Sequence, residues 1–373
     1  MKRRPFAFFC LLFLTRITAV AQGAPTEDST AAFLLTERIN SSYAESHPFL
    51  SPDGRTLFFS RREHPLNFGR DNASDIWVSY YQASQGHWSR AINLGPPLND
   101  ERDNRIVGVN TSENRLYLFR NEVPAGQSPI LVAERMGRLW APPRALPIRA
   151  FRNESETIDA FIDGEEQLLL LAIDTGAGRG RRDLHVSFRQ ADNTWSAPLP
   201  LGADLNTAGD EGRMWLAPDG RTLYFASDGY PGANGVDLYM SRRRDDSWTS
   251  WTTPQSLGDI INTAGDDGDF TLTADGTRLL ITRRTGEAPA DFYSVPLPIE
   301  LRPTPSVLVT GRLPAVYSPD TRLYWRPITA RSRPPQPISL QAGGRFKLIL
   351  PADLPAIALY AEAAGAFGLS ACI

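Results

Sequence analysis

The 373-residue chain predicts an all-β fold made of tandem copies of one unit, and repeated turns are the first reason. A Pro-Asp-Gly or Asp-Gly turn precedes an apolar, strand-like run at three places. We assign structural turns to Asp53-Gly54, Asp219-Gly220 and Asp275-Gly276, because Gly tolerates the positive φ that such turns require. Asp163-Gly164 is a weaker copy, and Asp163, Asp219 and Asp275 are equally spaced. A fixed spacing of this size indicates a supersecondary unit copied in tandem.

A second repeated motif, an Asp followed by apolar and often aromatic residues, supports the same period. Its copies are Asp75-Ile76-Trp77, Asp183-Leu184-His185, Asp237-Leu238-Tyr239 and Asp291-Phe292-Tyr293. Each repeat contains four strand-sized segments between turn residues and has no helical periodicity. Four short antiparallel strands per repeat are typical of a propeller blade. We therefore predict a β-propeller over residues 33–298, with five blades and with six as the alternative.

The segment before the first repeat is expected to close the ring. Leu35–Asn40 is similar to Leu257–Asn262, which ends a later repeat. We therefore expect the N-terminal segment to supply the outer strand of the last blade.

The pattern changes after Pro303, where strand-like segments flank a Pro- and Arg-rich stretch and a Gly343-Gly344 hairpin. These features predict a small β-sandwich over residues 306–373.

Residues 1–21 have the three parts of a secretory signal peptide: the basic Lys2-Arg3-Arg4, the apolar Phe6–Leu14 and the small-residue Ala19-Val20-Ala21. The apolar part is too short to span a bilayer, so we expect an exported chain without a transmembrane segment, periplasmic or associated with the outer membrane. Cleavage would remove Cys10 and leave Cys372 alone, which excludes an intramolecular disulfide and a cysteine zinc site.

The composition is that of a globular protein, with 42% hydrophobic and 22% charged residues and a net charge of −3. This charge argues against a nucleic-acid partner. The four histidines have no paired metal-ligand spacing, so we predict neither a metal nor another cofactor. Calcium at Asp266–Asp269 is a weaker alternative, because no full EF-hand spacing is present.

The Ser51–Ser60 turn and strand, the Asp237-Leu238-Tyr239 strand and the Trp195-Ser196-Ala197-Pro198 segment resemble the WD40-like propeller family built on a Pro-Asp core. That family includes the propeller of TolB and propellers of Bacteroidetes-type cell-envelope proteins. In many of these envelope proteins a carboxypeptidase-regulatory-like sandwich follows, which residues 307–365 resemble. An OmpA-like peptidoglycan-binding domain then follows in the family, and it is absent from this sequence. The resemblance implies a cell-envelope protein.

In a propeller, the loop between the second and third strands lies on the same face as the loop between blades. Acidic and Arg-rich loops of this chain would share that face. The candidate binding residues there are Arg70, Asp71, Arg181, Arg182, Asp210, Glu211, Asp266 and Asp267. Loops on a rigid scaffold often carry recognition, so we favour a non-catalytic, non-enzymatic scaffold that binds an envelope protein, peptidoglycan or another glycan. The competing interpretation is that these side chains cap turns locally.

An alternative function is a glycan-active hydrolase on the same five-bladed scaffold. Such enzymes use a pair of carboxyl groups near the central axis. The candidates on inner strands are Glu156, Asp159 and Asp269.

Overall fold

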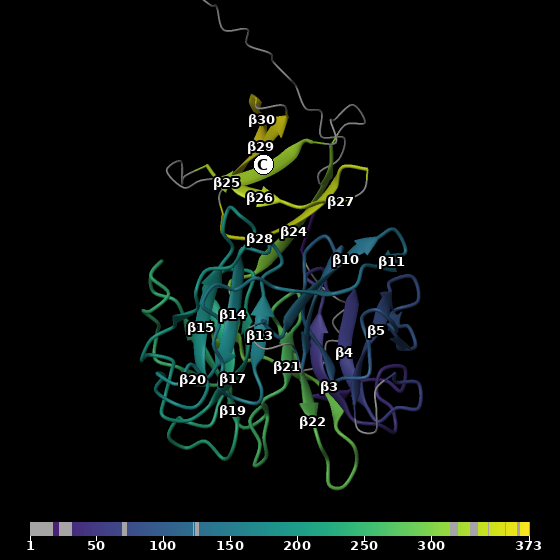
Figure 1. Ribbon diagram of the computed structural model, residues 1–373, viewed down its shortest axis with the longest axis vertical. Coiled ribbons are helices and arrows are strands. Elements are labelled where there is room, and N and C mark those ends of the chain that lie inside the picture. The colour runs from purple at the N-terminus through teal and green to yellow at the C-terminus, as the bar shows by residue number, and fades with distance from the viewer. Residues whose placement is uncertain are drawn as a thin grey trace, which may run out of the picture. The chain divides into compact units, whose positions relative to one another are not determined.

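The computed structural model describes residues 18–21, 32–68, 73–121, 123, 127–313, 320–328, 335–341, 343–354, 356–363 and 366–372 (Figure 1). These residues form β-strands and one 3-10 turn, Ile299–Leu301, and contain no α-helix. They divide into two compact units, residues 22–305 and residues 1–21 with 306–373. No helix in this part of the chain is long and apolar enough to cross a membrane.

The larger unit consists of antiparallel sheets that mostly follow one another along the chain. The first contains β3 (Glu45–Leu50), β4 (Thr56–Arg62), β5 (Ser74–Gln82) and β6 (His87–Trp88), with β7 (Ile92–Asn93) also on β5. The second contains β8 (Asn104–Val109), β9 (Arg115–Arg120), β10 (Ile130–Met136) and β11 (Leu139–Trp140), with β12 (Arg144–Ala145) also on β10. The third contains β13 (Asp159–Ile162), β14 (Leu168–Ile173), β15 (Asp183–Phe188) and β16 (Leu199–Pro200).

The fourth sheet contains β17 (Glu211–Leu216), β18 (Thr222–Ser227), β19 (Asp237–Arg242) and β20 (Gln255–Ser256). The last contains β21 (Phe270–Leu272), β22 (Arg278–Arg283) and β23 (Asp291–Pro296), and its outer strand is β2 (Phe33–Leu34). The predicted all-β fold of four-stranded antiparallel units is confirmed.

The N-terminal segment completes the last sheet, as the sequence predicts. Phe33 pairs with Ser294 and Leu34 pairs with Tyr293 in antiparallel register. The side chain of Asn40 strengthens this closure. Its Nδ2 donates to the carbonyls of Leu35 and Phe292, at 3.0 and 3.1 Å, and its Oδ1 accepts from the backbone N–H of Phe292 at 2.9 Å. The two ends of the unit are thereby joined by backbone and side-chain hydrogen bonds.

An asparagine makes the same kind of bridge in three other sheets. In each case the amide accepts from the N–H and donates to the C=O of one residue in the third strand. The pairs are Asn99 with Ile76, Asn206 with Leu184, and Asn262 with Leu238. Buried backbone groups need partners, and this amide supplies them where the outer strand is short. The recurring asparagine is therefore part of the scaffold.

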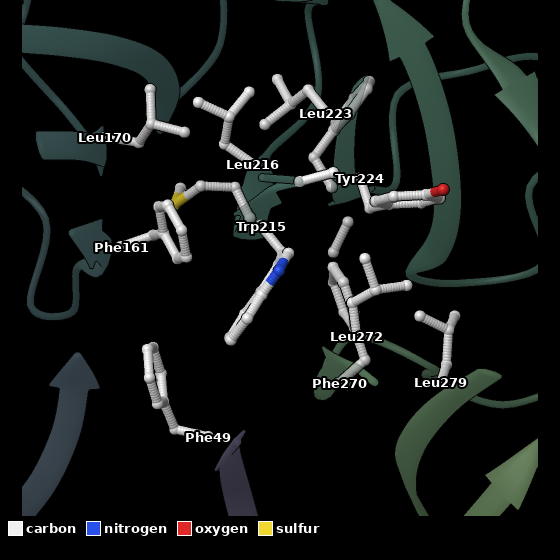
Figure 2. Packing of buried hydrophobic residues seen from close by; sticks show 14 of the residues in the cluster. Phe49, Phe161, Leu170, Trp215, Leu216, Leu223, Tyr224, Phe270, Leu272 and Leu279 are labelled. Atoms are coloured by element: carbon white, nitrogen blue, oxygen red, sulfur yellow. The ribbon is translucent and has the colours of Figure 1, made fainter. Parts of the chain in front are cut away.

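The first strands of the sheets lie together at the centre of the unit. Strands β3, β8, β13 and β17 contact one another in that order, and β21 contacts both β17 and β3. The contacts thus return to their starting strand, which makes the fold propeller-like. Bulky side chains of these strands meet at the axis: the Trp215 ring lies 4.8 Å from Phe49 and 5.0 Å from Phe161, between centroids. Figure 2 shows these three rings pointing toward one another.

The Asp-Gly turns join the first and second strands of three sheets. Gly54, Gly220 and Gly276 have φ values of 71°, 66° and 69°. In each turn the Asp carboxylate accepts from the backbone N–H two residues later, at 3.1, 2.8 and 3.0 Å from Asp53, Asp219 and Asp275 respectively. These six residues form structural turns, as predicted.

The smaller unit contains two four-stranded sheets. One is ordered β1 (Thr18–Ala21), β24 (Ser306–Arg312), β28 (Arg345–Pro351) and β27 (Leu340–Gln341). The other is ordered β26 (Gln336–Ile338), β25 (Arg322–Pro327), β29 (Ile357–Ala363) and β30 (Ala366–Cys372). Both contribute to one buried apolar cluster that includes Phe346, Leu348 and Leu359. The basic and apolar parts of the expected signal peptide, residues 2–14, lie outside the described residues.

Replacement of Asn40 tests the closure of the larger unit. Asn40→Ala removes the partners of a buried N–H and two carbonyls, so we expect the free energy of unfolding to fall by about 1–3 kcal/mol. Urea denaturation of the full chain measures this change. Asn234→Ala is the matched control, because the Asn234 side chain is exposed, and it should change stability by less than about 0.5 kcal/mol. Equal effects of the two substitutions would show that Asn40 does not close the unit.

Candidate active site

A small pocket with both ionisable and apolar lining lies where the first strands of the sheets converge. His47, Arg105, Asp159 and Arg213 line it, together with apolar side chains such as Phe119 and Ile158. Asp269 joins this group through its contacts with His47. Each of the five sheets therefore contributes one ionisable side chain to this group. The side chain comes from the first strand of the sheet or, for Asp269, from the residue just before that strand.

The register of the strands explains this convergence. His47, Asp159, Arg213 and Asp269 each lie three residues before the last residue of their strand, which is Leu50, Ile162, Leu216 or Leu272. Arg105 lies one residue further from the end of β8, where the pairing with β9 shifts between Ile106 and Gly108. Equivalent positions of copied sheets meet at the axis, so residues far apart in sequence become neighbours.

His47 lies between the carboxylate of Asp269 and the guanidinium of Arg105. Its backbone N–H donates to Oδ2 of Asp269 at 2.9 Å, and its ring Nδ1 lies 3.6 Å from the same oxygen. On the other side of the ring, Nη1 of Arg105 lies 3.0 Å from Nε2. A guanidinium has no acceptor, so Nε2 accepts this hydrogen bond and the proton of the neutral ring resides on Nδ1.

The charge states of His47 and Asp269 follow from their surroundings. Burial lowers the pKa of His47 to about 4, against the opposing effect of Asp269. Burial alone would raise the pKa of Asp269, but His47, Arg213 and Arg105 together hold it below its usual range. At neutral pH the imidazole is therefore neutral and the carboxylate is ionised.

Asp159 provides the second carboxylate of the pocket. Its Oδ2 lies 3.3 Å from Nη1 of Arg182, which belongs to the loop between β14 and β15. The third carboxylate expected from the sequence, Glu156, is exposed and does not line the pocket. The structure thus brings together two of the three predicted inner-strand carboxylates.

Two arginines of the pocket, the buried Arg213 and the half-buried Arg105, differ in their partners from the other buried arginines. Arg213 is 6% exposed, and its Nη2 donates to the backbone carbonyl of Pro48 at 2.7 Å. The guanidinium carbon of Arg105 lies 4.0 Å from the centroid of the Phe119 ring. Among the described residues, neither guanidinium has a carboxylate within ion-pair distance.

Other buried acids repeat from sheet to sheet, and their role is structural. Glu45, Glu211 and Asp267 accept from the hydroxyl four residues earlier, at 2.6, 2.7 and 2.9 Å. Glu211 is fully buried and Asp267 is 2% exposed. We expected these two residues on an exposed binding surface, and that expectation is wrong. Each carboxylate is buried and accepts a hydrogen bond within its own inter-sheet loop, so it is not accessible to a partner.

The remaining loop candidates are found in several places. Asp210 Oδ2 lies 2.8 Å from Nη2 of Arg181, and Asp266 Oδ1 accepts from the backbone N–H of Val236 at 3.0 Å. Arg182 reaches the pocket through Asp159. Arg70 and Asp71 lie outside the described residues. Over the described ranges, no group of three or more His, Cys, Asp or Glu side chains is arranged to hold a metal ion.

The sequence analysis missed His47, Arg105 and Arg213, although a signal for two of them is present. His47, Arg213 and Asp269 each precede the Asp of the following turn by the same number of residues, which places them at one position of the repeat. Repeats aligned on the turn would have grouped these three side chains. Arg105 lies one residue away from that position, counted from the end of its strand β8.

The comparisons with known proteins concern the fold. No known family model matches the chain, and no curated protein is similar to it. Similar solved structures include a mannose phosphorylase from Leishmania mexicana, with a TM-score of 0.41 and 12% identity over 72% of this chain and 88% of that one. A thermostable family-43 glycoside hydrolase has a TM-score of 0.41 and 12% identity over 90% and 96%. The Bacteroides ovatus GH43B of a xyloglucan PUL has a TM-score of 0.40 and 10% identity over 92% and 91%.

The expectation of a non-catalytic scaffold that is not an enzyme is corrected. The similar structures named above bear the names of glycoside hydrolases and a phosphorylase, not of binding scaffolds. The expectation of a scaffold relied on loop residues that recur from repeat to repeat. The pocket residues, in contrast, differ between the repeats. The roles proposed for the pocket residues rest on the side chains of this chain.

The pH dependence of stability tests the environment of His47. A histidine titrates near pH 6.5 when unfolded but at about 4 in the folded chain. Between these values the unfolded state binds more protons, so stability falls as the pH is lowered from 6.5 to 4, by up to about 3 kcal/mol from this residue. We expect His47→Gln to remove this part of the slope in denaturation curves measured at several pH values. Parallel curves for wild type and variant would contradict a buried, neutral His47.

Proposed function

We propose that the chain is a glycan-active hydrolase in which Asp159 and Asp269 are the catalytic carboxyl groups. The observation that carries this proposal is their placement: Asp159 lines the pocket at the axis, and Asp269, the residue before β21, contacts His47 of the same pocket lining. Hydrolysis of a glycosidic bond requires a pair of carboxyl groups on either side of that bond.

We also propose the number of blades in the larger unit and the architecture of the smaller unit. We take the five sheets of the larger unit as five blades of a closed propeller, supported by the contact of β21 with β3 and by the pairing of β2 with β23. We take the two sheets of the smaller unit as a β-sandwich, supported by their common apolar cluster. The relationship to WD40-like propellers with a Pro-Asp core and the export of the chain stay proposals based on sequence.

The cost of the polar groups supports a catalytic role over a structural one. Burying charged side chains is unfavourable unless they are well paired, and apolar residues would serve a structural core better. The same strands contribute Phe49, Phe161 and Trp215 to the apolar centre, each two residues after a pocket residue. The chain thus has an apolar packing layer beside a layer of ionisable groups that packing does not require.

Asp269 suits the role of base or nucleophile. Its pKa lies below the usual range, because the neighbouring positive charges outweigh the effect of burial, so it is ionised at neutral pH. The backbone N–H of His47 fixes Oδ2 of the same carboxylate at 2.9 Å. A fixed, ionised carboxylate can attack the anomeric carbon or remove a proton from an attacking water.

The proton-donating role then belongs to Asp159, the other carboxyl group of the pocket. In the unliganded chain Asp159 is ion-paired with Arg182. In this scheme the substrate separates Arg182 from Asp159 when it binds, and Asp159 takes up a proton from solvent. That proton passes to the leaving oxygen as the glycosidic bond breaks. A water molecule supplies the new hydroxyl group at the anomeric carbon, and its proton passes to Asp269 when the water attacks directly, or to Asp159 when Asp269 has first attacked that carbon.

Amide substitutions of the carboxylates test this assignment. Asp269→Asn and Asp159→Asn should each lower kcat/KM by about 10²–10⁴-fold on any glycoside that the wild-type chain hydrolyses, because neither amide exchanges a proton. A panel of aryl glycosides and polysaccharides provides the substrates, and thermal unfolding verifies that the variants fold. Glu156→Gln is the matched control, since Glu156 is exposed and lies outside the pocket, and it should leave the rate unchanged. Wild-type rates in both Asn variants would refute the assignment.

A further inference from the structure

The pocket contains guanidinium N–H groups that no described protein atom satisfies. A guanidinium has five N–H donors. Arg213 donates from Nη2 to the Pro48 carbonyl, and Arg105 donates from Nη1 to the ring of His47. No other acceptor contacts these two guanidinium groups among the described residues, so the remaining donors are free to bind a ligand.

The other buried arginines of the larger unit show how this chain normally pairs such a group. Arg61 is 5% exposed, and its Nε lies 2.7 Å from Oε1 of Glu45. Arg120 is 6% exposed, and its Nη1 lies 3.1 Å from Oδ2 of Asp100. Arg213 is equally buried but has a single neutral carbonyl as its partner. The Asp269 carboxylate acts on Arg213 electrostatically but is not within ion-pair distance of it, so the unsatisfied N–H donors of Arg213 remain available to an anionic ligand.

Both arginines line the same pocket, so one anion bound there would meet both guanidinium groups. Burial lowers the pKa of Arg105, and repulsion from Arg213 acts in the same direction while Asp159 and Asp269 oppose it. His47 provides no compensating negative charge, because it is neutral. An anion between the two guanidinium groups would relieve this repulsion and accept their free N–H donors.

We propose that Arg105 and Arg213 form an anion-binding subsite beside the two carboxylates, and that the substrate is an acidic glycan. The planar fork of a guanidinium matches a carboxylate, as in a uronic acid, or a phosphate ester on a sugar. The word substrate here rests on the proposed function, whereas anion binding by the pocket can be measured without turnover. The subsite would select acidic sugars and orient them toward Asp159 and Asp269.

Calorimetric titration of the full chain tests the subsite. The probes are glucuronate, galacturonate, glucose 6-phosphate, inorganic phosphate and, as the neutral reference, glucose. We expect at least one anionic sugar to bind about tenfold more tightly than glucose, which corresponds to one charge-assisted contact. Binding by the uronates identifies a carboxylate subsite, and binding by the phosphates identifies a phosphate subsite. Failure of every anionic probe to bind more tightly than glucose overturns the proposal.

Substitutions of the two arginines test whether the anion binds at this subsite. Arg213→Gln and Arg105→Gln should each abolish the preference for the anionic sugar, so that either one tests the proposal if the other fails to fold. Arg181→Gln is the matched control, because the Arg181 side chain is 82% exposed and pairs with Asp210 away from the pocket lining, and it should retain the preference. An unchanged preference in a folded Arg213→Gln or Arg105→Gln chain overturns the subsite. Hydrolysis of neutral glycans that depends on Asp159 and Asp269 would leave the proposed function intact in that case.

Discussion

The first strand of every sheet in the larger unit faces the same axis, and this constraint determines both the core and the pocket. The strands contact one another in a cycle, and the cycle is completed by β21 against β3. One position of the repeat therefore places bulky rings at the centre, and the position two residues earlier places ionisable groups there. The pairing of β2 with β23 completes the last sheet, so the arrangement at the axis depends on a segment from the start of the unit.

Repetition distinguishes scaffold from site in this chain. The asparagine that bridges the third strand in four of the five sheets recurs as the same residue, because the backbone groups that it satisfies recur. The buried acids Glu211 and Asp267 recur with their hydroxyl donors for the same reason. The pocket positions instead hold a histidine, two arginines and two aspartates. Copied sheets need identical side chains only where they need identical hydrogen bonds, and the pocket positions are not held to one residue type.

The parts of the fold that sequence could predict are those set by local chemistry. The Asp53-Gly54 turn and its copies require a positive φ that glycine allows, and the likeness of Leu35–Asn40 to Leu257–Asn262 indicated the closing strand. The sequence did not show which loop acids are buried. Glu211 and the more accessible Asp210 are neighbours in the chain, and only the folded structure shows how they differ in what packs on them. Asp159 and Asp269 were recognisable as inner-strand carboxylates. The arginines were not, since their lack of an ion-pair partner is a property of the folded pocket, and the emphasis on repetition favoured a scaffold over an enzyme.

The location of a bound sugar is the most direct test of the pocket as an active site. A crystal structure of the full chain soaked with a uronic-acid oligosaccharide would give that location. We predict a sugar ring at the axis, with its carboxylate against Arg105 and Arg213 and its glycosidic oxygen near Asp159 or Asp269. A saccharide bound on the outer loops, with the axial pocket unchanged, would contradict this prediction.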